Sequence, residues 1–171
     1  ERKYFAEAVR FVDQVALLDG QIGSETISLI DEVRPFTWVV MEEDDLPQKR
    51  AFCDANQIGY QVIAEEVLIQ LPDEPVTLDE SASSQKKVLV TGCFDWLHSG
   101  HVRFFEETSE LGDLYVVLGH DKNVRLLKGE GHPQFREEER RYMVQSIRFV
   151  KQALISSGHS WARPSWVTGT I

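Results

Sequence analysis

The sequence predicts an α/β fold of the Rossmann type, a parallel sheet with helices on both faces. Short apolar runs rich in β-branched residues alternate along the chain with longer amphipathic patterns. Strands separated by helices are typical of right-handed βαβ units, and such units build parallel sheets. One apolar run ends in a glycine shortly before a predicted helix, which is the usual geometry of the ligand-binding edge of such a sheet.

The predicted elements follow one another in this alternating order. The expected strands are 15–18, 36–41, 60–64, 87–91 and 114–119. The expected helices are 1–12, 24–33, one that begins at Pro47, 98–110 and 137–150. Residues 65–85 contain prolines and serines without periodicity, which favours a linker. The chain is therefore expected to have three parts, residues 1–64, the linker 65–85, and residues 86–171.

Composition places the chain among ordinary globular proteins. Of its 171 residues, 42% are hydrophobic and 27% are charged. The net charge of −10 disfavours general binding to nucleic acid. No apolar run approaches the roughly 20 residues of a membrane span. Cys53 and Cys93 are the only cysteines and form no CxxC pair, so we expect neither a zinc cluster nor a disulfide framework. The low cysteine content favours a cytoplasmic location.

The charge is unevenly divided between the two halves. Residues 1–85 hold 6 basic and 18 acidic residues, whereas residues 86–171 hold 12 and 10. A site that handles anions is therefore expected in the second half.

The chain also contains an internal repeat. Residues 1–14 match residues 139–152 at an offset of 138, with seven identical positions. A fainter similarity pairs residues 34–39 with residues 163–167. Two copies of one helix would compete for the same place in a fold, which favours pairing or exchange in a homodimer. We also expect residues 1–64 and 87–155 to build one sheet together.

The most informative motif is Gly92-Cys-Phe-Asp-Trp-Leu-His98-Ser-Gly-His101, between a strand and a helix. His98 and His101 are three residues apart and point to the same side of the first helical turn. Gly100 removes a side chain where an anion can lie against the backbone. Imidazoles donate hydrogen bonds and carry positive charge near neutral pH, which suits a phosphoryl group. Zinc binding would need a third ligand, and none is evident.

This motif resembles the signature of the HxGH nucleotidyltransferases, and in detail their cytidylyltransferase branch. That branch includes the glycerol-3-phosphate, choline-phosphate and ethanolamine-phosphate enzymes. The resemblance extends through residues 111–119, Lys128-Gly129 and Glu139-Arg140. Segments similar to the C-terminal half of the family come first in this chain, which implies a permuted order or a tandem protein cut inside both copies.

The resemblance implies a role for each matching residue. His98 and His101 are expected to bind the triphosphate and to stabilise the transition state at the α-phosphorus. Lys128, in a flexible loop over 126–132, is expected to clamp a phosphate, and Arg140 to contact the triphosphate. The residues expected around the nucleotide are Gly92, Cys93, Phe94, Asp95, Gly100, Asp44 and Asp45. Asp95 can instead cap the turn, Cys93 can contribute only its backbone, and Lys128 and Arg140 can be solvated charges.

The implied reaction is transfer of a nucleotidyl group, with cytidylyl favoured, from a nucleoside triphosphate to a phosphorylated small alcohol, with release of pyrophosphate. Mg²⁺ is expected to arrive with the triphosphate, so no residues are assigned as metal ligands. An adenylyltransferase is one alternative. A catalytically degenerate nucleotide-binding regulatory module is another, because residues 65–72 replace the Arg-Thr-x-Gly-Ile-Ser-Thr-like segment that the family places after its fifth strand.

Overall fold

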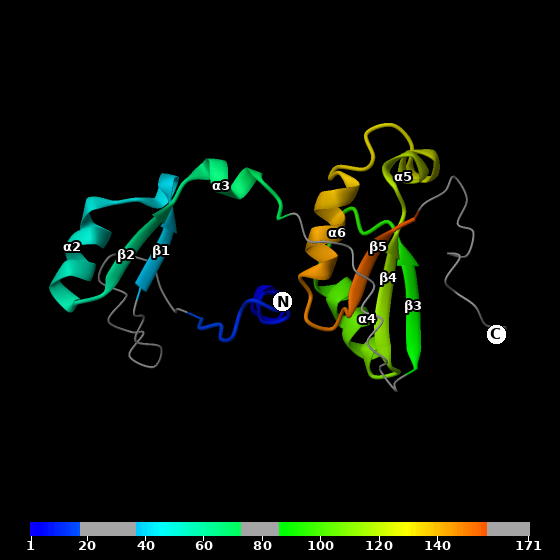
Figure 1. Ribbon diagram of the computed structural model, residues 1–171, viewed down its shortest axis with the longest axis horizontal. Helices are drawn as coiled ribbons and strands as arrows, with labels where there is room; N and C mark the ends of the chain where they lie inside the picture. The colour runs from blue at the N-terminus through cyan, green and yellow to red at the C-terminus, as the bar shows by residue number, and fades with distance from the viewer. Residues whose placement is uncertain (18–36, 73–85, 157–171) are drawn as a thin grey trace. The chain divides into compact units, whose positions relative to one another are not determined.

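The computed structural model describes residues 1–17, 37–72 and 86–156 (Figure 1). The chain divides into two compact units, one made of Glu1–Val15 with Glu74–Ile171 and the other of Ala16–Asp73. The predicted helix at 24–33 and most of the predicted linker lie outside the described residues. Residues 15–17, expected to begin a strand, have no regular structure.

The larger unit is built on a parallel sheet of three strands. They are β3 (Lys87–Gly92), β4 (Asp113–Leu118) and β5 (Gln152–Ile155), in the spatial order β3-β4-β5. Val90 pairs with Val116, and Val116 pairs with Ala153. The central strand β4 is an almost unbroken buried run, as expected for a parallel strand covered on both faces. The sequence predicted β3 and β4 within one residue at each end but missed β5.

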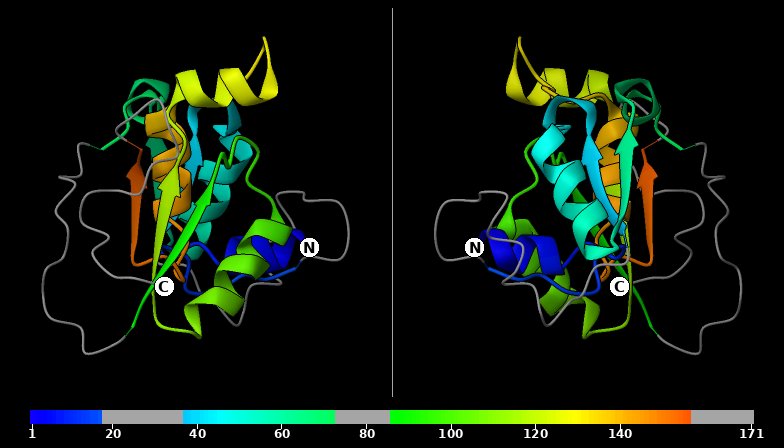
Figure 2. Two further views of the ribbon diagram at one scale, coloured as in Figure 1. Left: turned by 90° about the vertical axis from the view of Figure 1, so that its right-hand side faces the viewer. Right: turned by 90° about the vertical axis from the view of Figure 1, so that its left-hand side faces the viewer.

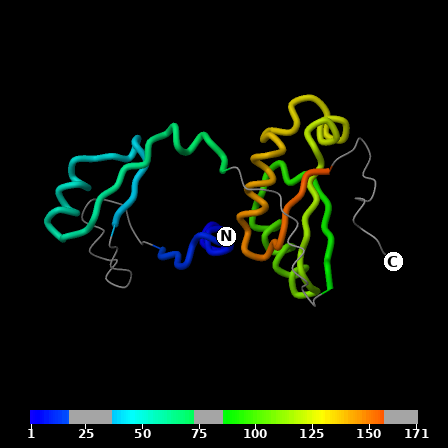
Figure 3. Tube along the Cα trace, viewed as in Figure 1, coloured from blue at the N-terminus to red at the C-terminus, as the bar shows by residue number. Residues whose placement is uncertain are grey.

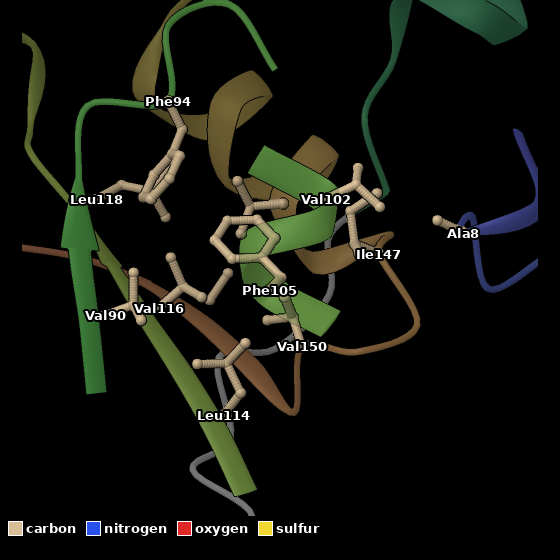
Figure 4. Close-up of a cluster of buried hydrophobic side chains, with 12 residues drawn as sticks. Ala8, Val90, Phe94, Val102, Phe105, Leu114, Val116, Leu118, Ile147 and Val150 are labelled. Carbon is tan, nitrogen blue, oxygen red and sulfur yellow. The ribbon is translucent and has the colours of Figure 1, made fainter. Parts of the chain in front are cut away.

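Helices flank this sheet. They are α1 (Arg2–Glu7), α4 (Ser99–Ser109), α5 (Asp121–Lys128) and α6 (Glu137–Gln145). Helix α4 contacts β4, and α6 contacts β4 and β5. Apolar side chains from α4, the turn after α6 and the strands gather in one core, in which Val102 and Phe105 meet Val90 and Val116 (Figure 4). Within the described ranges, no helix is long and apolar enough to cross a membrane.

The smaller unit contains a separate βαβ arrangement. Strands β1 (Thr37–Met41) and β2 (Gly59–Ile63) pair in parallel, and α2 (Pro47–Asn56) connects them with Pro47 in its first turn. A short 3-10 helix, η2 (Glu42–Asp44), follows β1. Helix α3 (Glu65–Ile69) occupies the start of the predicted linker. Both strands and α2 were predicted correctly, whereas α3 was not.

Two expectations concerned assembly. Among the described residues of one chain, β1 pairs with β2, and β3, β4 and β5 form a separate sheet. The sheet expected to be shared by residues 1–64 and 87–155 stays a prediction. The copies of the repeat do not compete for one place. Helix α1 lies alongside α4 (Figure 2), and the chain that follows α1 meets the turn between α6 and β5 (Figure 3). The argument from competition for a homodimer therefore fails.

Candidate nucleotide site

The candidate site begins where β3 and β4 end. The N–H of Gly119 donates to the carbonyl of Gly92 at 3.0 Å, which ties the two strand ends together. Phe94 adopts a left-handed backbone conformation with φ 48°, and its ring folds over Gly92. A β-carbon at position 92 would lie 2.6 Å from this ring, so the turn requires glycine there. The turn therefore fixes the direction in which the chain enters α4.

The two histidines of the motif lie together at the start of α4. His98 is the N-cap, and its Nδ1 accepts a hydrogen bond from the N–H of Gly100 at 3.1 Å. The neutral ring of His98 therefore carries its proton on Nε2. The ring centroids of His98 and His101 are 3.9 Å apart, with 36° between the ring planes. The close approach of the two rings confirms that the pair faces one side, with His98 exposed and His101 half-buried.

The electrostatic surroundings of His101 favour its neutral form. Burial lowers the pKa of His101 below its ordinary value of 6.5, and the positive charges of His98 and Lys128 lower it further, while the backbone of Trp96 acts in the opposite direction. At neutral pH the ligand-free ring is therefore mostly uncharged. An anion bound between these groups would offset the positive charges of His98 and Lys128. It would therefore favour the imidazolium form of His101.

Asp95 holds the segment that follows α5. Its side chain is fully buried, and it accepts hydrogen bonds from the N–H groups of Gln134 at 2.7 Å and Phe135 at 3.3 Å. Its Oδ2 lies 2.7 Å from Nδ1 of His132. Burial alone would raise the pKa of Asp95, but these hydrogen bonds and the charge of Lys128 hold it below its ordinary value. With its oxygens used in this way, Asp95 positions residues 132–135 rather than capping its own turn.

Lys128 is the last residue of α5, so residues 126–128 are helical rather than part of a flexible loop as predicted. The helix stops because Gly129 has φ 90°, a conformation that favours glycine. Lys128 is exposed, and its charge contributes to lowering the pKa of both Asp95 and His101. Its positive charge therefore acts on the region of the histidine pair.

Arg140 has a different place from the one predicted. Its side chain is 1% exposed and donates to the carbonyls of Phe135 at 3.0 Å, Cys93 at 2.6 Å and Gly119 at 2.8 Å. It also pairs with Asp121 at 2.8 Å. Direct contact with a triphosphate does not fit this geometry, because the guanidinium is buried among these acceptors. Arg140 instead fixes the ends of β3 and β4 and the start of α5. Cys93 contributes its backbone carbonyl here, in agreement with the interpretation that it supplies only its backbone.

Asp44 and Asp45 lie in the smaller unit. Asp45 accepts hydrogen bonds from Arg50 at 2.9 and 2.5 Å and from Tyr60 at 3.2 Å. The hydrogen bond from Arg50 holds the pKa of Asp45 below its ordinary value. The backbone carbonyl of Asp44 accepts from Lys49. The expected position of these two carboxylates beside the histidine pair stays a prediction.

The sequence reasoning missed two further residues of the site region. His132 was read only as the end of a loop, although it follows a Gly-x-Gly run and directly precedes a proline. His120 caps α5, since its Nδ1 accepts from the N–H groups of Lys122 and Asn123 at 3.1 and 3.3 Å. His120 also follows the predicted strand 114–119 directly, and this position is the signal that could have identified it. In the described part of the chain, no cluster of three His, Cys, Asp or Glu residues is arranged to hold a metal ion.

Comparisons with known proteins agree with this geometry. The family model described as cytidylyltransferase-like matches residues 89–160, which include the histidine pair. The bifunctional protein HldE of Sulfurimonas denitrificans is 29% identical over 150 residues, which are 86% of this chain and 28% of that protein. HldE of Desulfatibacillum aliphaticivorans is 35% identical over 101 residues, 50% of this chain and 21% of that protein. The FAD synthase of Ferroglobus placidus is 41% identical over 80 residues, 46% of this chain and 51% of that protein.

One solved structure is also similar. The lipopolysaccharide core biosynthesis protein of Thermoplasma volcanium GSS1 is 32% identical, with 42% of this chain and 58% of that chain covered and a TM-score of 0.40. The chain spans between about a fifth and about a half of the length of the curated relatives named above. The glycine-ended strand, the stacked histidines at the helix start and the family match converge on the same segment. Residues 89–160, which hold the histidine pair, match the cytidylyltransferase-like family model.

Proposed function

We propose that this domain transfers a nucleotidyl group from a nucleoside triphosphate to a phosphorylated small molecule and releases pyrophosphate. The observation that carries the proposal is the stacked pair His98 and His101 at the first turn of α4, beyond the end of β3. The N-terminus of a helix offers backbone N–H groups and a positive dipole end to phosphates. Two imidazoles at that position add hydrogen-bond donors on the same side.

The chemistry needs positioning and charge neutralisation more than covalent help. An oxygen of the acceptor phosphate attacks the α-phosphorus, and the bond from the α-phosphorus to the oxygen that bridges to the β-phosphate breaks. Pyrophosphate leaves with the electron pair of that bond. The attacking phosphate is already ionised, so no general base is required. Mg²⁺ enters as part of the magnesium–triphosphate substrate.

Each residue of the site has a separate role in this reaction. His98 presents Nε2–H to the phosphates, because its Nδ1 is engaged by Gly100. His101 becomes positively charged when the triphosphate is bound, and it then stabilises negative charge that develops during displacement. Lys128 adds a second positive charge from the end of α5. Arg140 and Asp95 hold the backbone segments that frame these groups.

The choice of nucleotide is the finer part of the proposal. The family description supports CTP as the nucleotide. A phosphorylated small alcohol is the acceptor that the resemblance of the motif implies. The similarity to an FAD synthase, whose product contains an adenylyl group, supports ATP as the alternative. A cytoplasmic location is also part of the proposal. The homodimer expected from the sequence stays a prediction.

A nucleotide-binding module without turnover is the second candidate function. The segment after β2, where the family resemblance implies a Ser/Thr-rich grip on the nucleotide, is α3 with Glu65 and Glu66 in its first turn. Carboxylates at a helix N-terminus repel phosphates, so this segment does not serve as such a grip.

Thermal unfolding with Mg²⁺ and each of CTP, ATP, GTP and UTP identifies the nucleotide that binds. A screen of phosphorylated alcohols with pyrophosphate detection then measures turnover. We expect His101→Ala to lower kcat by about 10²-fold, whereas Arg103→Ala, an exposed change on the same helix, leaves kcat unchanged. Stabilisation by a nucleotide without pyrophosphate release from any acceptor favours the binding module. No stabilisation by any of the four nucleotides contradicts both functions.

A further inference from the structure

The imidazole of His132 is held by a buried carboxylate. Its Nδ1 lies 2.7 Å from Oδ2 of Asp95, whose side chain is fully buried. Burial acts to raise the pKa of Asp95, but the hydrogen bonds that it accepts and the charge of Lys128 hold the pKa below the ordinary value of 3.8. Asp95 is therefore ionised at neutral pH and can only accept hydrogen bonds. Nδ1 of His132 is the donor in this contact, and this fixes the tautomer of the neutral ring.

The segment that carries His132 is fixed by further contacts. Asp95 also accepts from the backbone N–H groups of Gln134 and Phe135. The ring of Phe135 meets the ring of Trp96 edge-on, with 5.7 Å between the ring centroids. The backbone and the ring at position 132 are thus set before any ligand arrives, which lowers the entropy cost of binding there.

The second ring nitrogen of His132 is available to a ligand. The side chain is 35% exposed, and among the residues that the structure describes Nε2 has no hydrogen-bond partner. If position 132 served only to satisfy Asp95, one donor would suffice. An imidazolium placed between Asp95 and a bound anion donates one N–H to each, and both hydrogen bonds are charge-assisted.

The contact with Asp95 brings His132 to the turn that carries the histidine pair. Asp95 precedes His98 by three residues on that turn. Burial is the main influence that lowers the pKa of His101, and the positive charge of Lys128 lowers it further, as it also lowers the pKa of Asp95. The proposed reaction needs two anions at this place, the triphosphate and the acceptor phosphate. The histidine pair serves the triphosphate, so the acceptor phosphate needs a donor from another segment.

We propose that His132 binds the phosphate of the acceptor, with Nδ1–H donated to Asp95 and Nε2–H donated to one phosphate oxygen. This inference rests on the proposed function and adds to it the residue that positions the nucleophile. A second oxygen of the same phosphate stays free to attack the α-phosphorus. Asp95 is a positioning residue in this arrangement, because it acts only through His132 and the backbone around it. The ligand class is a phosphate monoester, and inorganic phosphate is its smallest mimic.

Proton NMR of the imidazole groups tests this site on the full chain. Single substitutions of histidine by asparagine assign the ring C–H resonances of His98, His101 and His132. Inorganic phosphate should shift the resonances of His132. It should do so equally after Mg²⁺ with CTP, or Mg²⁺ with ATP in a second sample, has been added, because the two anions occupy separate places. The nucleotide alone should shift the resonances of His98 and His101.

Substitutions of His132 separate ligand binding from support of the segment. His132→Asn keeps an N–H for Asp95 and removes Nε2, so the melting temperature should stay at the wild-type value while the affinity for inorganic phosphate falls about tenfold. In turnover assays the KM for the acceptor should rise by the same factor, and the KM for the nucleotide should not change. His132→Arg, whose guanidinium donates on two sides, should keep the affinity for phosphate. Arg136→Gln removes an exposed positive charge from the same segment and is the matched control.

The outcomes separate this inference from the proposed function. If nucleotide shifts His98 and His101 but phosphate does not shift His132, the acceptor site is wrong and the proposed function stands. If phosphate shifts His132 in a chain that no nucleotide binds, the phosphate site stands and the proposed function is contradicted. A nucleotide that shifts His132 by itself and abolishes its response to phosphate assigns His132 to the triphosphate and overturns the proposal. An equal loss of phosphate affinity in Arg136→Gln also overturns it, since only general charge attraction would be involved. Should His132→Asn fail to fold, His132→Arg assigns the resonances by the same subtraction and the wild-type titration decides.

Discussion

The imidazole of His98 lies over Gly100, where an added β-carbon would come within 2.9 Å of its Cε1 and 3.0 Å of its Nδ1. The sequence led us to assign the open space at Gly100 to an anion. The structure shows that the ring of His98 fills it, with Nδ1 held by the N–H of the same glycine. The glycine therefore sets the direction of the histidine rather than contacting a ligand through an open backbone.

Substitution of this glycine should damage catalysis without damaging the fold. In Gly100→Ala the β-carbon clashes with the ring of His98 and displaces it from its present orientation, so kcat should fall about tenfold or more. Alanine is a better helix former than glycine, so the melting temperature should not drop. Steady-state kinetics and thermal unfolding measure both effects, with Ser99→Ala in the same turn as the control. Unchanged kcat in Gly100→Ala would show that the orientation of His98 has no role in turnover.

Nucleotide binding should take up protons near neutral pH. The pKa of His101 in the free protein is lowered by burial and by the charges of His98 and Lys128, and a bound triphosphate raises it. The complex then binds more protons than the free components, so the dissociation constant should fall as the pH decreases through the region around 6.5. Titration calorimetry in buffers of different ionisation enthalpy measures the uptake. His101→Gln should reduce it, and an equal uptake by that variant would assign the proton to another group.

Lys128 should act on substrate binding. Its ammonium lies at the end of α5 with an electrostatic influence on both Asp95 and His101. A charge-assisted hydrogen bond to a phosphate contributes about 1.5 kcal/mol or more, so Lys128→Ala should raise KM about tenfold. Arg125→Ala removes an exposed charge one turn earlier on the same helix and should leave KM unchanged. Equal effects of the two variants would mean that only general charge attraction is involved.

Asp95 should matter for stability and for the order of the segment after α5. Asp95→Ala leaves the N–H groups of Gln134 and Phe135 without their acceptor, which costs about 1–3 kcal/mol of unfolding free energy. Urea unfolding measures this cost, and limited proteolysis should show faster cleavage within residues 129–135. Asp54→Ala, an exposed change on α2, is the matched control. Cleavage at the wild-type rate would show that other contacts hold this segment.

The strand, turn and helix around the histidine pair were predictable because each depends on nearby residues. Gly92 ends an apolar run, and the spacing of His98 and His101 places both rings on one face of a helical turn. Helix α5 was harder to predict, since it has only eight residues and its Leu126 and Leu127 are 76% and 60% exposed. Strand β5 has only four residues, too few for periodicity to be visible.

The role of Arg140 depends on distant parts of the chain. Its acceptors are the carbonyls of Phe135, Cys93 and Gly119, which come together only when both strands and the following segments are in place. A charged residue in the first turns of a helix has the same local sequence signal whether it is solvated, bound to a phosphate or buried. The repeat showed the same limit, because sequence identity at an offset of 138 does not reveal that the two copies pair with each other.

Arg2 and Arg140 occupy equivalent positions of the repeat, yet Arg2 is exposed and Arg140 is buried among backbone carbonyls. The two copies are therefore under unequal constraint. Position 2 tolerates many side chains, whereas position 140 accepts only one that can donate in several directions at once. A sequence profile that pooled the two copies would average these positions and underestimate the damage from a substitution at Arg140.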